Sequence, residues 1–274
     1  ICNGTAQPLS LPNNEWFRGR IGFAASKLRS DNSRFLFVHD GISKIFRMRI
    51  TASGPIYDNY IINNGVQVSS EQRGELELLE LPNGEYKLAS CSTPMGGNNI
   101  SSQVYYTTLN ANGNIVPGTE HFYYFYNTTG NSIFKTKPFG LEFSPNGNYL
   151  YVVHNVTPDH PNPIEYIDVS TNISYPIVVS GQSDFQRTQI EIGKDNKLYF
   201  ATNNRLATLS NPNTPAAANW NNSAHLITYN QTLDYAGPQF VSSYTLPDQI
   251  DGMDYSSHFS VNTQCCISSS YYDA

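Results

Sequence analysis

The sequence is poor in charge, lacks helical periodicity and contains no long apolar run. Charged residues make up 14% of the 274-residue chain, against about 25% in ordinary soluble domains. Neutral Asn, Ser, Thr, Gly and Pro replace them, together with 19 Tyr and 14 Phe. Small polar residues suit turns, and aromatic residues suit strands. Because no segment keeps a helical period, the composition predicts an all-β protein of one large domain or two small ones.

Further absences bear on function. The net charge of −6 and the lack of a basic block argue against nucleic-acid binding. No run of 18 apolar residues is present, so no membrane-spanning helix is expected. The sequence contains no GxSxG elbow, no HExxH zinc motif and no phosphate-binding glycine loop. No motif therefore indicates an enzyme, and no cofactor is expected.

A strand–turn–strand pattern occupies residues 140–153, GLEFSPNGNYLYVV. Leu141 and Phe143 alternate with polar residues before the turn, and a continuous apolar run follows it. We expect Asn146 and Gly147 to adopt positive φ at both central positions of the turn. The pattern predicts a hairpin whose second strand is covered on both faces.

Looser copies of this hairpin recur along the chain, at residues 28–38, 76–89 and 190–201. The four turns are centred on Asn32, Asn83, Asn146 and Asp195. Each hairpin is followed by an alternating strand, at residues 45–54, 104–113, 164–172 and 205–213. A repeat of roughly 40–60 residues is typical of β-propeller blades. We expect four-stranded antiparallel blades with the hairpins as inner strands, and degenerate blades around residues 1–24, 57–75 and 215–250.

The later half of the chain resembles a known family. FGLEFSPNGNYLYVV, PIEYIDVS, TQIEIGKDNKLYFA, LSNPNTPAAANW and LPDQIDGMDY follow one another between about residues 137 and 255. This succession is similar to the propeller segment of large Bacteroidetes surface proteins that the type IX secretion system exports, many with gliding-motility-associated modules. Asp195-Asn196 stands where that family has Asp-Gly, and LPDQI where it has LPNFI. The resemblance implies a seven-bladed propeller at the cell surface, and about five blades can be traced from the repeat, which gives five to seven.

The expected domain organisation is one propeller over residues 1–264. Residues 265–274 are expected to begin a linker to a further domain of a longer polypeptide. The start ICNGTAQ has neither an initiating Met nor a leader peptide, which favours a piece of an exported protein, extracellular or at the cell surface. In a closed ring the first and last segments should lie side by side at the seam.

The four cysteines allow three pairings if all are oxidised. None of Cys2, Cys91, Cys265 and Cys266 has the spacing of a metal site. The adjacent Cys265 and Cys266 are poorly placed to bond to each other. Closure of a ring would bring Cys2 close to one of them at the seam, which makes a disulfide there sterically reasonable. Four free, buried thiols are the alternative.

Candidate ligand-binding residues are few. His39 ends a predicted strand before Asp40, where a structural role is favoured because neighbouring strand residues point to opposite faces. Asp184 and Arg187 precede an inner strand and are expected at the mouth of a central channel, or in a buried ion pair.

Two acidic or histidine-rich stretches are candidates for metal binding. Asp248 and Asp251 belong to a run of aspartates that superficially resembles a calcium loop, but the run lacks the alternate-position ligands and the closing Glu. Blade closure is therefore preferred there, with calcium as the alternative. His154, Asp159 and His160 occur in one stretch without standard metal-ligand spacing.

These observations predict a non-catalytic extracellular interaction domain of an adhesin-like protein, which binds protein or glycan through loops at one rim. Tyrosines suit either partner, and packing of outer strands is their other role; the candidates are Tyr105, Tyr123, Tyr124 and Tyr126. The alternative hypothesis is a lactonase-like propeller hydrolase with a divalent cation at the channel mouth. Metal analysis of the purified protein distinguishes the two.

Overall fold

The computed structural model describes residues 22–39, 44–62, 75–92, 103–124, 138–154, 162–179, 185, 188–202 and 205–226. These residues form four four-stranded antiparallel sheets, and the strands of each sheet follow one another in chain order. One short 3-10 helix, η3 (Pro215–Ala217), is the helical element of this part of the chain. The all-β prediction and the four-stranded antiparallel unit are thus confirmed.

The bounds of the strands follow chain order. The first sheet contains β1 (Phe23–Ala25), β2 (Arg34–His39), β3 (Ile45–Thr51) and β4 (Gly54–Ile62). The second contains β5 (Glu75–Glu80), β6 (Tyr86–Ser92), β7 (Gln103–Leu109) and β8 (His121–Tyr124). The third contains β9 (Pro138–Phe143), β10 (Tyr149–His154), β11 (Ile164–Asp168) and β12 (Ile173–Ile177). The fourth contains β13 (Ile190–Ile192), β14 (Leu198–Thr202), β15 (Arg205–Ser210) and β16 (Asn219–Leu226).

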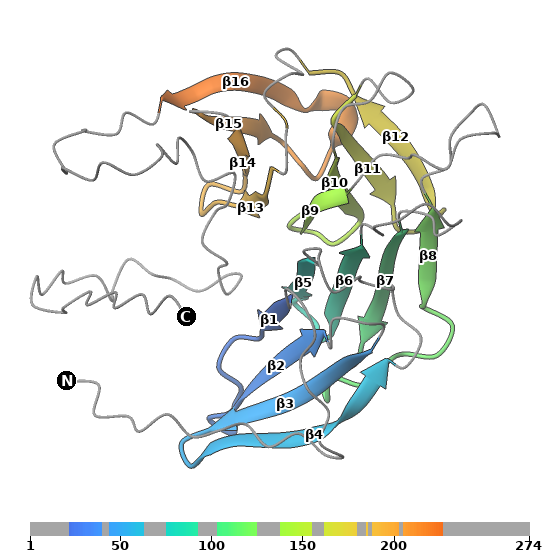
Figure 1. Ribbon diagram of the computed structural model, residues 1–274, viewed down its shortest axis with the longest axis vertical. Coiled ribbons are helices and arrows are strands. Elements are labelled where there is room, and N and C mark those ends of the chain that lie inside the picture. The colour runs from blue at the N-terminus through green and yellow to red at the C-terminus, as the bar shows by residue number, and fades with distance from the viewer. Residues whose placement is uncertain are drawn as a thin grey trace, which may run out of the picture.

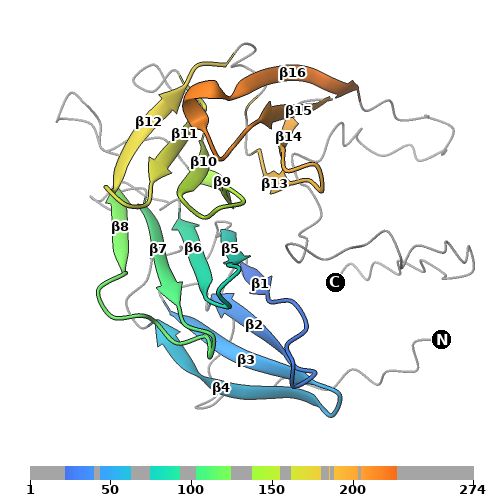
Figure 2. The same ribbon diagram turned by 180° about the vertical axis from the view of Figure 1, so that it is seen from behind.

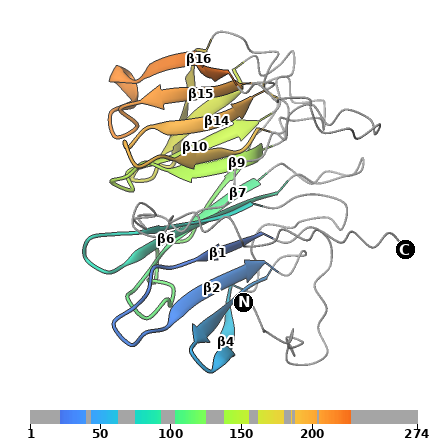
Figure 3. The same ribbon diagram turned by 90° about the vertical axis from the view of Figure 1, so that its left-hand side faces the viewer.

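Neighbouring sheets meet through their first strands. β1 packs against β5, β5 against β9, and β9 against β13. The later strands spread outward, so that the four sheets form an arc (Figures 1 and 2). Figure 3 shows the first sheet at one end of this succession and the fourth at the other. The arrangement is consistent with consecutive propeller blades. The predictions of the blade count, the seam and the positions of the two chain ends concern residues outside the described ranges.

In the second, third and fourth sheets the predicted hairpins form the first two strands, and in all four sheets the predicted trailing strands form the third. In the first sheet the prediction is wrong for the first strand, because β1 precedes the hairpin expected at residues 28–38, which supplies only β2. The proposed degenerate blades need correction where the structure describes them. Residues 23–24 belong to β1, residues 57–62 to β4 and residues 219–226 to β16, so all three segments complete sheets already counted. The fourth strand of a sheet lies at its outer edge, and neither β8 nor β12 has a fully buried residue, so these strands carry no clear apolar alternation. That is why the repeat did not reveal it.

The hairpin turns differ from the expected Asn-Gly geometry. In the third sheet the Gly147 N–H donates to the Ser144 carbonyl (2.7 Å), and Gly147 has φ of +70°, whereas Asn146 has no positive φ. This is the pattern of a type I turn followed by a left-handed residue. The corresponding left-handed residues of the four hairpins are Asn32, Gly84, Gly147 and Asn196. Asn32 is therefore equivalent to Gly84, one residue beyond the expected Asn83.

The hydrophobic core consists of layers between consecutive sheets. Phe35, Leu88 and Tyr105 belong to the layer between the first and second sheets. Ala89, Leu141 and Val152 lie between the second and third, and Tyr151, Phe200 and Ala207 between the third and fourth. Residues 150–153 of β10 alternate between the last two layers and are at most 1% exposed. The prediction that this strand is covered on both faces is confirmed.

The innermost strands approach each other closely. A Cβ on Gly140 of β9 would lie 2.7 Å from the Thr188 carbonyl oxygen, just before β13, so only glycine fits there. Acidic side chains link the same strands. Glu75 accepts a hydrogen bond from the Leu141 N–H, and Glu142 accepts one from the Ile192 N–H, each at 2.9 Å.

No helix within the described ranges has the length and apolar character needed to cross a membrane.

Candidate functional site

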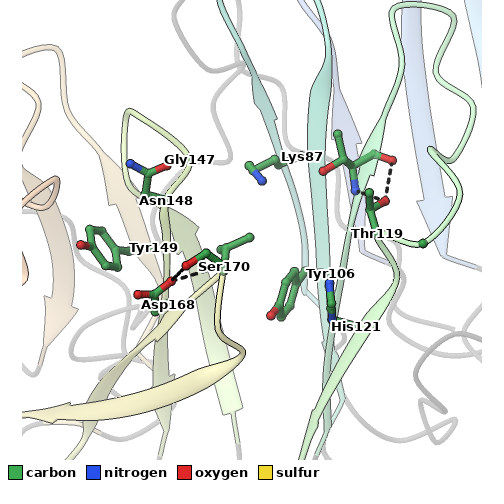
Figure 4. Close-up of a pocket in the computed structure, with 12 residues that line it drawn as sticks. Lys87, Tyr106, Thr119, His121, Gly147, Asn148, Tyr149, Asp168 and Ser170 are labelled. Atoms are coloured by element: carbon green, nitrogen blue, oxygen red, sulfur yellow. Dashed lines mark hydrogen bonds between the residues drawn. The ribbon is translucent and has the colours of Figure 1, made fainter.

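A groove of about 500 Å³, lined by both polar and apolar surface, lies between the second and third sheets (Figure 4). The wall formed by the second sheet carries Lys87 on β6, Tyr106 and Thr108 on β7, and His121 on β8. The opposite wall consists of the β9–β10 turn at residues 147–149 and the β11–β12 turn at residues 168–170. Gly118 and Thr119, just before β8, complete the lining.

Strand pairing places the residues of the first wall on one face. Lys87 is paired across the ladder with Thr108, and Tyr106 with His121. Paired residues of an antiparallel ladder project to the same side, about 4.5–5.5 Å apart at Cβ. Tyr106 and Thr108 also share a face because alternate strand residues do. The wall is therefore a fixed array on three hydrogen-bonded strands.

Tyr106 supports His121. The Tyr106 side chain is 2% exposed, and its hydroxyl donates a 2.8 Å hydrogen bond to Oδ1 of Asn172. The His121 ring stacks on it, with centroids 5.2 Å apart and planes at 27°. Burial, followed by the nearby Asp168 charge, raises the pKa of Tyr106 to about 12. The phenol therefore stays neutral near pH 7 and holds the imidazole in one orientation at the groove.

Lys87 brings a cation to the groove. Its aliphatic stem lies over Gly147, since a Cβ there would meet Lys87 Cδ and Cε at 3.0 Å. Burial lowers the pKa of Lys87, and the negative charge of Glu85 opposes that shift. Among the described residues, no hydrogen bond or ion pair to the Lys87 ammonium group is present. Figure 4 shows Lys87 between the two walls.

The opposite wall is anionic and well ordered by its own turns. Oδ1 of Asp168 accepts hydrogen bonds from the Ser170 N–H (2.9 Å) and the Ser170 hydroxyl (2.6 Å). The Val169 N–H donates to the Asn148 carbonyl (3.0 Å), which ties the two turns together. The Asn148 side chain is exposed at the rim. The groove thus has Lys87 and His121 on one wall and a carboxylate on the other (Figure 4).

A partly buried chain of polar side chains joins the same two sheets. The Tyr123 hydroxyl and the Ser174 hydroxyl lie 2.6 Å apart, and Ser174 donates to Oε2 of Glu165 at 2.9 Å. Oε1 of Glu165 lies 3.5 Å from Nε2 of His154. The chain crosses from β8 to β12, β11 and β10. The Tyr123–Ser174 contact is the one in this chain that links the second sheet to the third.

Of the ligand-binding and metal-binding candidates predicted from sequence, the two that the structure describes, His39 and His154, do not line the groove. His39 ends β2, is 2% exposed and donates its backbone N–H to the Gly22 carbonyl (3.0 Å). His154 is a buried residue of β10. Asp40, Asp159, His160, Asp184, Arg187, Asp248 and Asp251 lie outside the described residues.

The cysteine and tyrosine candidates are described only in part. Cys91 is a free, fully buried thiol with Sγ 3.8 Å from the Pro138 carbonyl oxygen; Cys2, Cys265 and Cys266 lie outside the described residues. Tyr105 is fully buried and therefore belongs to the core, whereas Tyr123 and Tyr124 are half-buried. Tyr126 lies outside the described residues.

Sequence reasoning did not identify the groove, because its residues come from five separate segments that only sheet packing brings together. Lys87 sits in a repeated hairpin, on the same face of β6 as the buried Ala89 and Cys91, and no periodic signal marks it. Within the described ranges, no three His, Cys, Asp or Glu side chains converge as metal ligands. The residues proposed for a channel-mouth metal are not among those described, so the hydrolase hypothesis stays a prediction.

Neither a family model nor a curated protein sequence matches the chain. Among solved structures, a protein of unknown function from Bacteroides thetaiotaomicron is 12% identical (TM-score 0.40), over 74% of this chain and 43% of that one. PorZ, a surface component of the type IX secretion system of Porphyromonas gingivalis, is 14% identical (TM-score 0.39), over 76% of this chain and 29% of that one. The β-propeller domain of Cps50 (Swd1) from Myceliophteria thermophila is 10% identical (TM-score 0.33), over 72% and 67%. This chain spans less than half the length of the first two.

Proposed function

We propose that the chain is a non-catalytic interaction domain and that the groove between the second and third sheets is its ligand-binding site. The observation that carries the proposal is the set of polar groups that face this groove. Lys87, Thr108, His121 and Asn148 line it, and the described residues provide no hydrogen-bond partner for these side chains.

The construction of the groove suits recognition. Sites on strands hold their side chains more precisely than sites on loops, and Lys87, Thr108 and His121 are held by strand pairing. The facing turns are short and tied to each other through Val169 and Asn148. A preorganised site loses less entropy when a ligand binds.

The lining favours a polar ligand, either a glycan or a hydrophilic segment of a protein. Protein–protein interfaces rely on aromatic and other apolar anchors that fill desolvated pockets. The large exposed apolar side chains of the described residues, which include Phe23, Ile173 and Val178, are not among those that line the groove.

Blocking the groove tests the proposal. Asn148→Trp places a bulky side chain at the rim, where the residue is exposed. Ala52→Trp, in the exposed β3–β4 turn of the first sheet, is the matched control. The wild-type chain should be retained on an array of neutral and acidic oligosaccharides or on a peptide array. Asn148→Trp should abolish that binding and Ala52→Trp should preserve it. Binding that Asn148→Trp leaves intact, or no binding at all, would reject the groove as the site.

The wider setting is also part of the proposal. A closed propeller of five to seven blades, an extracellular or cell-surface location and a longer adhesin-like polypeptide are supported by the sequence pattern and its resemblance to exported surface proteins. The hydrolase hypothesis makes a separate demand. It requires one tightly bound divalent cation per chain, so metal analysis after dialysis against a weak chelator decides it.

A further inference from the structure

Three features of the groove, taken together, narrow the class of ligand. The first is the Lys87 ammonium group, which is partly buried, is influenced by the negative charge of Glu85 and makes no hydrogen bond or ion pair with a described residue. A charge taken out of water is costly unless it is paired. An anionic group on a ligand would pair with it.

The second feature lies beside Lys87. Thr108 is its cross-strand partner and lines the same groove. Its hydroxyl can donate to an oxyanion that Lys87 binds, as hydroxyl and ammonium donors jointly hold carboxylate or sulfate oxygens. His121 lies one strand further out, and its ring is fixed flat against Tyr106.

The third feature is the opposite charge across the groove. Oδ1 of Asp168 is occupied by Ser170, and an ionised carboxylate accepts hydrogen bonds only. A ligand seated here therefore needs an anionic group toward Lys87 and hydroxyl donors toward Asp168. An acidic sugar has both on one ring. An acidic peptide places its carboxylates against Lys87 but offers few hydroxyl donors for the second wall.

We propose that the groove selects acidic carbohydrate, with the carboxylate or sulfate of the sugar bound by Lys87 and Thr108, its hydroxyls facing Asp168, and its ring beside His121. This inference rests on the proposed function, because it names the ligand class of the same groove. The carboxylate and the sulfate share one recognition chemistry, so the test includes both.

The test uses isothermal titration calorimetry to compare the affinities of matched ligands for the 274-residue chain. The probes are an oligogalacturonate, the same oligosaccharide with its carboxyl groups reduced, a sulfated oligosaccharide and a poly-glutamate peptide. At least one acidic sugar should bind about tenfold or more tightly than the reduced, neutral one. The difference should shrink as salt rises, because screening weakens partly exposed ion pairs.

The decisive variant is Lys87→Met, which keeps an unbranched stem over Gly147 and removes the charge. It should weaken the binding of the acidic sugar by about tenfold to a hundredfold and leave the affinity for the neutral sugar unchanged. Lys197→Met removes an exposed lysine in the fourth sheet, where Lys197 pairs with Asp195 (2.6 Å), and should change nothing. Lys87→Gln is the second variant if Lys87→Met fails to fold by circular dichroism.

The remaining outcomes separate the two proposals. One outcome would overturn the preference for acidic sugars but keep the groove as the binding site. In that outcome neutral sugars or peptides bind, Asn148→Trp abolishes their binding, and Lys87→Met leaves it unchanged. Equal binding of poly-glutamate and acidic sugar would assign the groove to acidic peptides instead. Acidic-sugar binding that is unaffected by both Asn148→Trp and Lys87→Met would overturn both proposals.

Discussion

Glu142 on β9 accepts a hydrogen bond from the backbone N–H of Ile192 on β13, with 2.9 Å between Oε2 and N. Glu75 and Leu141 repeat the relationship between the second and third sheets. In both pairs a carboxyl group on the first strand of one sheet satisfies an N–H at the inner edge of the next. A buried N–H without a partner costs free energy, so these acids stabilise the packing between sheets.

Replacing Glu142 should therefore reduce stability in a graded way. Glu142→Leu leaves the Ile192 N–H without its acceptor and should lower the free energy of unfolding by about 1–3 kcal/mol. Glu142→Gln keeps an acceptor oxygen and should lower the free energy of unfolding clearly less than Glu142→Leu does. Urea denaturation of both variants measures the difference. Equal losses would show that the hydrogen bond to Ile192 is not the source of the effect.

Two turn glycines should respond differently to alanine. Gly84 and Gly147 both have positive φ, of +82° and +70°, which costs a non-glycine residue about 1–2 kcal/mol. A Cβ on Gly84 would meet only Ala111 Cβ at 4.0 Å, whereas one on Gly147 would lie 3.0 Å from Leu81 and Lys87 atoms. Gly147→Ala should destabilise the fold more than Gly84→Ala in thermal or urea unfolding. Identical losses would mean that the Lys87 side chain moves without cost.

Stability should fall at alkaline pH, partly through Tyr106. The pKa of its phenol is raised to about 12 in the fold, against about 10 in an unfolded chain. Between these values the unfolded chain has lost a proton that the folded chain keeps. The contribution of Tyr106, about 2–3 kcal/mol, is therefore present below about pH 10 and lost as the pH rises through 12.

The comparison variant is Tyr106→Phe. Its free energy of unfolding should decline less steeply than that of the wild type from about pH 9 to about pH 12. The pKa values of Tyr105 and Tyr151 are also raised by burial, but both residues are present in both proteins, so the difference in slope isolates Tyr106. Parallel slopes would contradict the prediction.

The polar chain that joins the second and third sheets should show energetic coupling. Tyr123→Phe and Ser174→Ala each remove one member of the 2.6 Å contact, and their double-mutant cycle should give an interaction energy of about 0.5–3 kcal/mol. Tyr105→Phe is the control, because Tyr105 bonds instead to Glu120 (2.9 Å). Its effect should add to that of Ser174→Ala within about 0.5 kcal/mol. If the stability losses of Tyr123→Phe and Ser174→Ala simply add, water replaces the contact between the two hydroxyls without loss of stability.

The parts of the fold that were predictable from sequence are those encoded locally. The hairpin at residues 140–153 is one continuous stretch, and its apolar alternation and Pro-Asn-Gly turn specify two strands and their connection. The turn geometry was misassigned because Asn-Gly also suits two-residue turns. The structure instead places only Gly147 in the left-handed region.

The groove was not predictable because no local pattern encodes it. Lys87 and His121 are separated by a whole strand and a connection, and Asp168 comes from another sheet. What brings them together is the packing of β6–β8 against the turns of the third sheet. Asn172 illustrates the difficulty: its amide supports Tyr106 from across the sheet boundary, although in the sequence it is one more turn asparagine.

Each sheet is formed by one uninterrupted stretch of chain. This affects how the protein can fold during synthesis. A growing chain completes each ladder from neighbouring segments, which favours early and fast folding. Glu75 and Glu142 belong to the earlier sheet of each pair, and the N–H groups they bind belong to the later one. Each acceptor is thus synthesised before its donor, so a finished sheet can act as the template on which the next one docks. Arrested nascent chains of increasing length should gain amide protection one sheet at a time, and protection that arises only at full length would exclude vectorial assembly.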